Sequence, residues 1–231
     1  MDFRDRHVVV TGGTGALGAA VTSALLDRGA VCHIPVHGSG PPQDFAFASN
    51  ERVRLYPSLD LSDQDQTDAF YARVGPLWAS IHLAGGFAAR KLKNSGKADL
   101  MKQLDTNVVS CFLCCRAALK AFGTDGGRIV NVAARPALEP RSGAGMTAYT
   151  IGKAGVAALT MALAEEVAGD GVLVNAVAPS VMDTAANRKA MPKADHALWP
   201  KVEQVAATIL FLASPENTVT RGAIVPVYGR S

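Results

Sequence analysis

The segment Thr11-Gly-Gly-Thr-Gly-Ala-Leu-Gly18 decides the fold of this chain. It follows a short apolar run that begins at His7, and a helical pattern begins at about Gly15. Gly13, Gly15 and Gly18 therefore form a G-x-G-x-x-G motif on a strand–turn–helix, where glycines permit a tight turn and close approach to a pyrophosphate. We predict that this turn binds the phosphates of a dinucleotide at the helix N-terminus.

Strand and helix patterns alternate along the rest of the chain. Strands rich in valine and isoleucine, separated by helices, indicate a parallel sheet covered on both faces. We predict an α/β Rossmann fold: a doubly wound, mostly parallel sheet of about seven strands, in a single domain over residues 1–231. The expected strands are His7–Thr11, Ala30–Val36, Val53–Pro57, Ser80–Ala84, Arg128–Val132, Val172–Ala178 and Ala223–Val227. The expected helices are Gly15–Arg28, Ser62–Val74, Lys97–Phe122 (one helix or two abutting helices), Thr147–Ala168 and Val202–Ala213.

Two segments show no periodicity and are expected to be loops, Gly38–Asn50 and Pro179–Pro200. In a doubly wound sheet, ligands bind beyond the carboxyl ends of the strands, so both loops are expected to border the site. The second loop, from about residue 180 to 200, is the expected substrate loop.

Composition excludes several classes of protein. With 231 residues, 48% hydrophobic and 19% charged, the chain predicts a buried core and no disorder. The net charge is +3 and no run of basic residues exceeds a pair such as Arg90-Lys91, so we expect no nucleic-acid surface. No apolar run approaches the ~20 residues that span a bilayer. We expect a cytoplasmic protein without membrane or nucleic-acid partners.

Three of the four cysteines, Cys111, Cys114 and Cys115, lie on one side of a predicted helix. A metal site would need a further pair of ligands, and no cluster of cysteine or histidine supplies one. We therefore predict packing at these positions and no metal.

The pair Tyr149 and Lys153 lies four residues apart on one helix face. An ammonium beside a phenol favours the ionised form and lowers a phenol pKa that is ordinarily near ~10. Tyr149 would then donate a proton to a developing alkoxide during hydride transfer, and Lys153 would also hold the nicotinamide ribose. Alone, such a pair is more often an ordinary surface contact. Its position after the strand Ile129–Val132 and downstream of the phosphate turn favours the catalytic interpretation.

These motifs resemble the short-chain dehydrogenase/reductase family over essentially the whole chain. Thr11, Gly12 and Gly18 match its T-G-x-x-x-G-x-G pattern, with Ala16 in place of the middle glycine, and the Tyr149–Lys153 pair matches Y-x-x-x-K. The resemblance implies a homodimer or homotetramer, and a catalytic set of Tyr149, Lys153 and Asn107, the asparagine ordering a water relay to the lysine. Motif, spacing and resemblance together predict these cofactor-binding residues: Thr11, Gly12, Gly13, Thr14, Gly15, Ala16, Leu17, Gly18, His37, Asp60, Leu61, Ala84, Gly85, Gly86, Lys153, Pro179 and Thr184.

The end of the second strand bears on the choice of dinucleotide. An acidic residue there, ~20 residues past the phosphate turn, would bind the adenosine ribose of NAD. This chain has Val36 and His37 instead, and no carboxylate between Asp27 and Asp44. His37 and Ser39 are able to donate to a 2′-phosphate, although no arginine lies nearby. We predict NADP, with NAD left open.

The chain departs from the family at the fifth strand. Ala133 and Ala134 replace two serines, of which the second polarises the substrate oxygen in the family. Loss of such a donor costs about two to three powers of ten in rate. Ser142 and Thr147 are the candidates to replace it.

A further resemblance is to the quinonoid dihydropteridine reductases, which lack the same serine. It covers Gly15–Gly18, Ala84–Phe87, Arg135–Leu138 with Gly145 and Met146, and Asp183–Pro192 with Ala194, Asp195 and Trp199. A conjugated, electron-poor acceptor needs less polarisation. We therefore expect a reductase of a small carbonyl or conjugated (pterin- or quinone-like) substrate. The alternative is a dinucleotide-binding sensor or partner protein with weak or no turnover.

Overall fold

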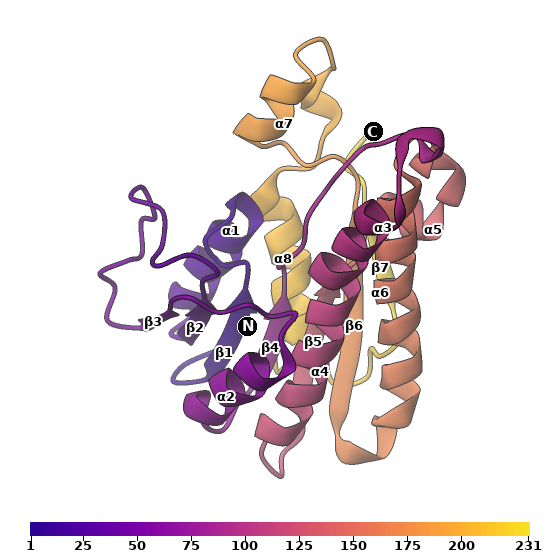
Figure 1. Cartoon of the computed structure of the whole chain (residues 1–231). Helices are drawn as coiled ribbons and strands as arrows, with labels where there is room; N and C mark the ends of the chain where they lie inside the picture. Colours follow the sequence, from indigo (N-terminus) through magenta and orange to yellow (C-terminus); the bar gives the residue numbers. More distant parts are fainter.

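All seven strands belong to one parallel sheet in the computed structural model, which describes residues 1–231 (Figure 1). The strand order is β3-β2-β1-β4-β5-β6-β7, so the chain runs outward in one direction, returns to the centre, and then runs outward in the other. This is the predicted doubly wound sheet, and it places a switch point between β1 and β4. The strands are β1 (His7–Thr11), β2 (Val31–Pro35), β3 (Val53–Tyr56), β4 (Ala79–His82), β5 (Gly127–Val132), β6 (Val172–Pro179) and β7 (Ile224–Val227).

Helices cover both faces of the sheet, as Figure 1 shows. Successive strand residues point to opposite faces, so Val8 and Val10 pack with α1 and α8 while Val9 packs with α2, α4 and α6. The helices are α1 (Ala16–Leu26), α2 (Gln64–Val74), α3 (Lys97–Leu104), α4 (Ser110–Ala121), α5 (Arg135–Leu138), α6 (Thr147–Glu166), α7 (Ala185–Ala190) and α8 (Val202–Ala213). No helix combines the length and the apolar character that crossing a bilayer requires.

The pattern over Lys97–Phe122 is one continuous helical path with a π-helical turn, Asp105–Val109, between α3 and α4. Single π turns inside α-helices occur often at functional sites, because the extra residue redirects a side chain. Here the turn contains Asn107, one of the predicted catalytic residues.

The expected loop Pro179–Pro200 is only partly a loop. It contains α7 and a 3₁₀ turn, His196–Leu198, and α5 after β5 was also not predicted. These helices have at most six residues, too few to show a periodic apolar face. The other expected loop, Gly38–Asn50, contains no helix or strand.

The turn between β1 and α1 requires glycine at two positions. Gly12 has a φ of +64°, and a Cβ there would lie 2.8 Å from the amide nitrogen of Ala84. A Cβ at Gly18 would lie 2.1 Å from the carbonyl oxygen of Gly12. Ala16 is the first residue of α1 and needs no positive φ, so alanine replaces the family glycine there without strain.

Candidate active site

Two adjoining cavities lie at the carboxyl ends of the central strands. The central cavity, of about 310 Å³, extends from the phosphate turn to Tyr149 and Lys153. The His37 cavity, of about 420 Å³, extends from the same turn to His37 and Asp60. Both are lined by Gly12 and Gly85, so they form one continuous path across the switch point between β1 and β4. An extended two-part ligand such as a dinucleotide fits this arrangement.

Most predicted cofactor-binding residues line this path. The central cavity is lined by Gly12, Gly15, Ala16, Leu17, Gly18, Gly85, Gly86, Lys153, Pro179 and Thr184. The His37 cavity is lined by Gly12, Thr14, His37, Asp60, Leu61, Ala84 and Gly85. Ser62 also lines it and was not predicted.

Thr11, Gly13 and Asn107 line neither cavity and act on the path indirectly. The Thr11 hydroxyl oxygen accepts a hydrogen bond from the Ala84 amide at 3.1 Å, which ties the loop after β4 to the end of β1. Gly13 lies against Ile34, where a Cβ would come within 2.9 Å of the isoleucine side chain.

Asp60 at the far end of the path is held in one orientation by Ser62. The Asp60 carboxylate accepts from the Ser62 amide at 2.9 Å and from the Ser62 hydroxyl at 2.7 Å. These hydrogen bonds keep the pKa of the Asp60 carboxyl below its usual value, so the group is ionised. His37 is exposed beside it.

Tyr149, on the first turns of α6, is half-buried, and its hydroxyl has no hydrogen-bond partner in the protein. The Phe87 ring packs edge-on against it, with 5.0 Å between ring centroids. Burial raises the pKa of Tyr149 to about 12. The expected lowering by Lys153 is therefore wrong for the protein without cofactor, because loss of water around the phenol dominates.

Lys153 is buried one turn further along α6, and its Nζ donates to the carbonyl oxygen of Val132 at 2.8 Å. Burial lowers the pKa of Lys153 to about 8. A small environmental change near neutral pH thus controls whether this group is charged.

Neither candidate for the missing serine supplies a free donor. Ala134 lines the central cavity, so the position is the expected one. The Ser142 hydroxyl donates to the carbonyl oxygen of Glu139 at 2.8 Å, and a serine has only one proton to donate. Thr147 lines neither the central cavity nor the cavity described next.

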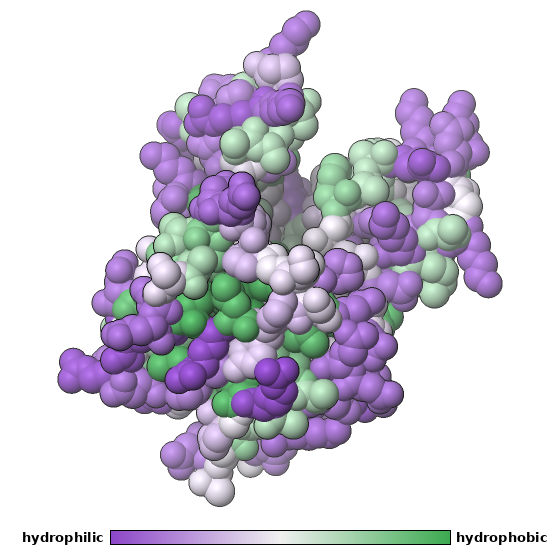
Figure 2. All heavy atoms as spheres, turned by 60° about the vertical axis from the view of Figure 1, so that its left-hand side comes forward, coloured by the Kyte–Doolittle hydropathy of each residue, from purple (hydrophilic) through white to green (hydrophobic).

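A third cavity, the outer cavity, adjoins the central one and has a volume of about 440 Å³. Figure 2 shows the hollow at the top of the molecule, between the projecting segment that carries α7 and the part facing it. Met182 and Trp199 both line it. Arg135 and Asn187 also line it and were not singled out from the sequence.

The cysteines have a histidine neighbour that the sequence did not reveal. His82 from β4 meets Cys111 and Cys115 of α4, and the three ligand-type atoms lie within 4.8 Å of one another. The expectation that no such cluster exists is wrong, because strand pairing and helix packing bring distant residues together. All three groups surround the Asn131 side-chain oxygen, at 2.8 Å for His82 Nδ1, 3.3 Å for Cys111 Sγ and 3.6 Å for Cys115 Sγ. That oxygen accepts hydrogen bonds from all three groups, so the cluster is a buried hydrogen-bond network.

Comparison with known proteins agrees with this geometry. The family model described as short chain dehydrogenase matches residues 6–195. The chain belongs to the short-chain dehydrogenase/reductase family. It is therefore an NAD(P)-dependent oxidoreductase.

Among relatives in this family, galactitol 2-dehydrogenase of Rhizobium johnstonii is 32% identical, over 96% of this chain and 93% of that protein. Cis-4-hydroxycyclohexanecarboxylate dehydrogenase of Sinomonas cyclohexanicum is 32% identical, over 98% of this chain and 96% of that protein. The solved structure of ElxO with NADP bound superposes with a TM-score of 0.86, at 24% identity, over 97% of this chain and 98% of that one. The last comparison shows the shared fold.

Proposed function

We propose that this short-chain dehydrogenase/reductase uses NADP(H) to reduce a small carbonyl or conjugated substrate, with Tyr149 as the general acid. The position of Tyr149 carries the proposal, because this residue lines both the central cavity and the outer cavity. Its hydroxyl has no partner in the protein, so it is free to contact a substrate oxygen. A proton donor at the boundary between a cofactor cavity and a second cavity is the arrangement that hydride transfer requires.

The nicotinamide, when bound, supplies the hydride. Tyr149 donates its hydroxyl proton to the substrate oxygen that gains negative charge. A pKa of about 12 keeps Tyr149 protonated before hydride transfer. Lys153, charged below a pH of about 8, favours the phenolate that remains. In the cofactor-loaded protein its ammonium would also hold the nicotinamide ribose.

NADP is the proposed dinucleotide. The only carboxylates that line the His37 cavity are those of Asp60 and Asp105. The Asp60 carboxylate is hydrogen-bonded to Ser62, and Asp105 lies in the π turn. His37 at the end of β2 is exposed, and no acidic residue follows that strand to repel a 2′-phosphate. The structural relative ElxO binds NADP, which supports the same preference.

The acceptor is proposed to be one that needs little polarisation, because Ala134 removes a donor and no nearby hydroxyl replaces it. Quinone-like and pterin-like rings meet this requirement. The relatives act on galactitol and on a cyclohexane alcohol, so a simple carbonyl is the second class to examine.

The test is the oxidation of NADPH and of NADH with quinonoid dihydropterin, 9,10-phenanthrenequinone and cyclohexanone as acceptors. We expect NADPH to be preferred, and both conjugated acceptors to exceed cyclohexanone in kcat/KM. Tight binding of NADPH without turnover of any acceptor would favour a dinucleotide-binding sensor or partner protein instead.

Self-association is also proposed, through the outer face of α4 and α6. Phe112 on α4 and Met161 on α6 expose 51% and 49% of their surface, so both are able to contact a second copy of the chain. Light scattering on the purified protein should give the mass of a dimer or tetramer, and Phe112→Asp should reduce it to that of a monomer.

A further inference from the structure

The walls of the outer cavity are mainly apolar. Its walls include the aromatic, thioether and proline side chains of Phe87, Pro136, Met146, Met182, Met191 and Trp199. Methionine side chains are flexible and polarisable, and they adapt well to flat ring systems. Arg135 has the only charged side chain that lines this cavity.

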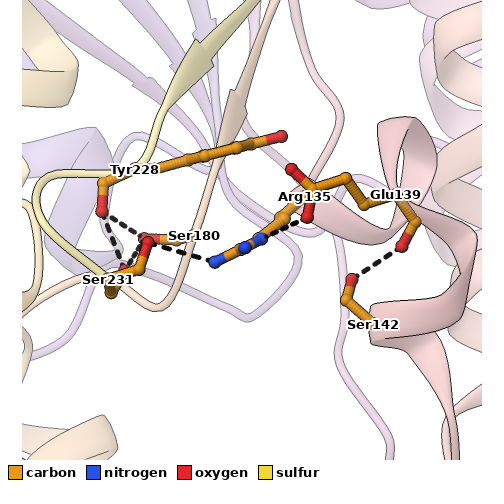
Figure 3. A network of polar contacts seen from close by, with 6 residues as sticks. All are labelled: Arg135, Glu139, Ser142, Ser180, Tyr228 and Ser231. Carbon is orange, nitrogen blue, oxygen red and sulfur yellow. Dashed lines mark hydrogen bonds and ion pairs between the residues drawn. The ribbon is translucent and has the colours of Figure 1, made fainter.

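Arg135 is held in a fixed orientation by groups around it (Figure 3). Its Nε donates to the Glu139 carboxylate at 2.8 Å, and its Nη1 donates to the main-chain oxygen of Ser231 at 3.1 Å. The guanidinium carbon lies 4.9 Å from the centroid of the Tyr228 ring. An arginine that is fixed in advance loses little side-chain entropy when it binds a further group.

The second terminal nitrogen, Nη2, has no hydrogen-bond partner in the protein. It carries two N–H groups, and the guanidinium cannot lose its charge. The Ser142 and Ser180 hydroxyls, which line the same cavity, do not compete for a ligand as donors. Ser142 donates to the Glu139 carbonyl oxygen at 2.8 Å, and Ser180 is 2.9 Å from the Tyr228 carbonyl oxygen.

The position of Arg135 in the chain places it close to the proposed reacting centre. It directly follows Ala134 and begins α5, so β5 delivers it to the same end of the sheet as the catalytic residues. Arg135 and Tyr149 line one cavity from different segments. A substrate that places its reacting oxygen at Tyr149 therefore has its remaining part among apolar walls and Arg135.

We propose that Arg135 is a specificity-determining residue that binds a carboxylate on the substrate, whose ring lies against the apolar walls of the outer cavity. This inference rests on the proposed function, because it assigns the outer cavity to the substrate. A carboxylate matches the charge-assisted hydrogen bonds that the free Nη2 offers. Glu139 neutralises Arg135 in the absence of substrate and holds the guanidinium through Nε, which leaves Nη2 unoccupied.

The experiment compares 4-formylbenzoate with its methyl ester, two aldehydes of similar shape that differ in charge. In the wild type we expect kcat/KM with NADPH to be higher for the carboxylate. Arg135→Gln should lower that value about 10- to 100-fold, mainly through KM, and should leave the ester within about threefold. Arg141→Gln is the matched control, because Arg141 is exposed on the neighbouring 3₁₀ turn and does not line the cavity.

A second variant and a second readout keep the outcome decisive. Arg135→Lys keeps the charge, so it should retain part of the preference even where Arg135→Gln folds poorly. Quenching of tryptophan fluorescence by benzoate and by methyl benzoate measures binding without turnover, because Trp199 lines the cavity. The wild type could fail to reduce either aldehyde and still bind benzoate more tightly than methyl benzoate, with this difference lost in Arg135→Gln. That result would reject the proposed function and keep the anion site. The inference would be overturned if the wild type showed no preference for the carboxylate in turnover or in binding. It would also be overturned if Arg135→Gln affected the carboxylate and its methyl ester equally.

Discussion

Asn107 is hydrogen-bonded to both backbone groups of Gly86. Its side-chain oxygen accepts from the Gly86 amide at 3.1 Å, and its side-chain nitrogen donates to the Gly86 carbonyl at 3.0 Å. The π turn between α3 and α4 presents Asn107 to this loop, which lines the central cavity. Asn107 thus fixes the floor of the proposed cofactor path, a role distinct from the water relay that the family resemblance implies.

Asn107→Ala should destabilise the protein and weaken dinucleotide binding together. Removal of a buried side chain that bonds Gly86 twice leaves backbone groups unpaired, so the free energy of unfolding should fall by about 2–3 kcal/mol. We expect the NADPH dissociation constant to rise about tenfold, because the loop after β4 loses its fixed position. Urea unfolding and fluorescence titration measure the two effects. Asn94→Ala, at an exposed asparagine, should change neither; an unchanged Kd in Asn107→Ala would argue against the positioning role.

Ala134→Ser should restore activity selectively. A hydroxyl at this position in the wall between the central and outer cavities would polarise a substrate oxygen. The kcat/KM for cyclohexanone should rise by about 10- to 100-fold, whereas that for 9,10-phenanthrenequinone should change less than about threefold. Steady-state NADPH oxidation measures both. An equal change for the two acceptors would show that the missing serine does not select the substrate class.

His37→Asp should reverse the preference for the dinucleotide. A carboxylate at the end of β2 repels a 2′-phosphate and accepts hydrogen bonds from a ribose, so the ratio of the NADPH and NADH dissociation constants should rise about 100-fold. Ser49→Asp adds the same charge at an exposed position that does not line the His37 cavity, and it serves as the control. If His37→Asp and the wild type had the same ratio of dissociation constants, the adenosine end of the dinucleotide would have to bind away from His37.

Lys153 should make stability and activity depend on pH in opposite ways. Its pKa falls from 10.5 to about 8 on folding, so the unfolded chain binds more protons between these values and the free energy of unfolding rises with pH across that window. Relative to Lys153→Met, the wild type should gain about 2 kcal/mol between pH 8 and pH 10. Urea unfolding of both proteins at the two pH values measures this difference.

Reduction should decline across the same range, since Lys153 loses the charge that supports Tyr149. The difference in unfolding free energy between wild type and Lys153→Met could instead be the same at both pH values. That result would mean that burial does not lower the pKa of Lys153.

Local patterns in the sequence predicted the parts of the site that lie on single elements. The phosphate turn and the Tyr149–Lys153 pair each depend on spacing within one strand–turn–helix or one helix, and the structure places them on one path. The sequence likewise predicted all seven strands, and the central ones have the apolar runs of buried parallel strands.

Features that depend on packing between distant segments were missed or predicted wrongly. Arg135 gains its fixed orientation from Ser231, 96 residues away along the chain. His82 meets Cys115 only because β4 lies beside α4. Burial raises the pKa of Tyr149, and the four-residue spacing between Tyr149 and Lys153 gives no information about that burial. Sequence reasoning therefore located the candidate groups, and the fold determines their environment.

The central claim is that Tyr149 donates the proton, and Tyr149→Phe tests it most directly. NADPH binding by fluorescence and single-turnover oxidation with the preferred acceptor should be measured on the same preparations. We predict that the variant binds NADPH within about threefold of the wild type, while its rate falls about 10²- to 10⁴-fold. Turnover by Tyr149→Phe at the wild-type rate would contradict the account.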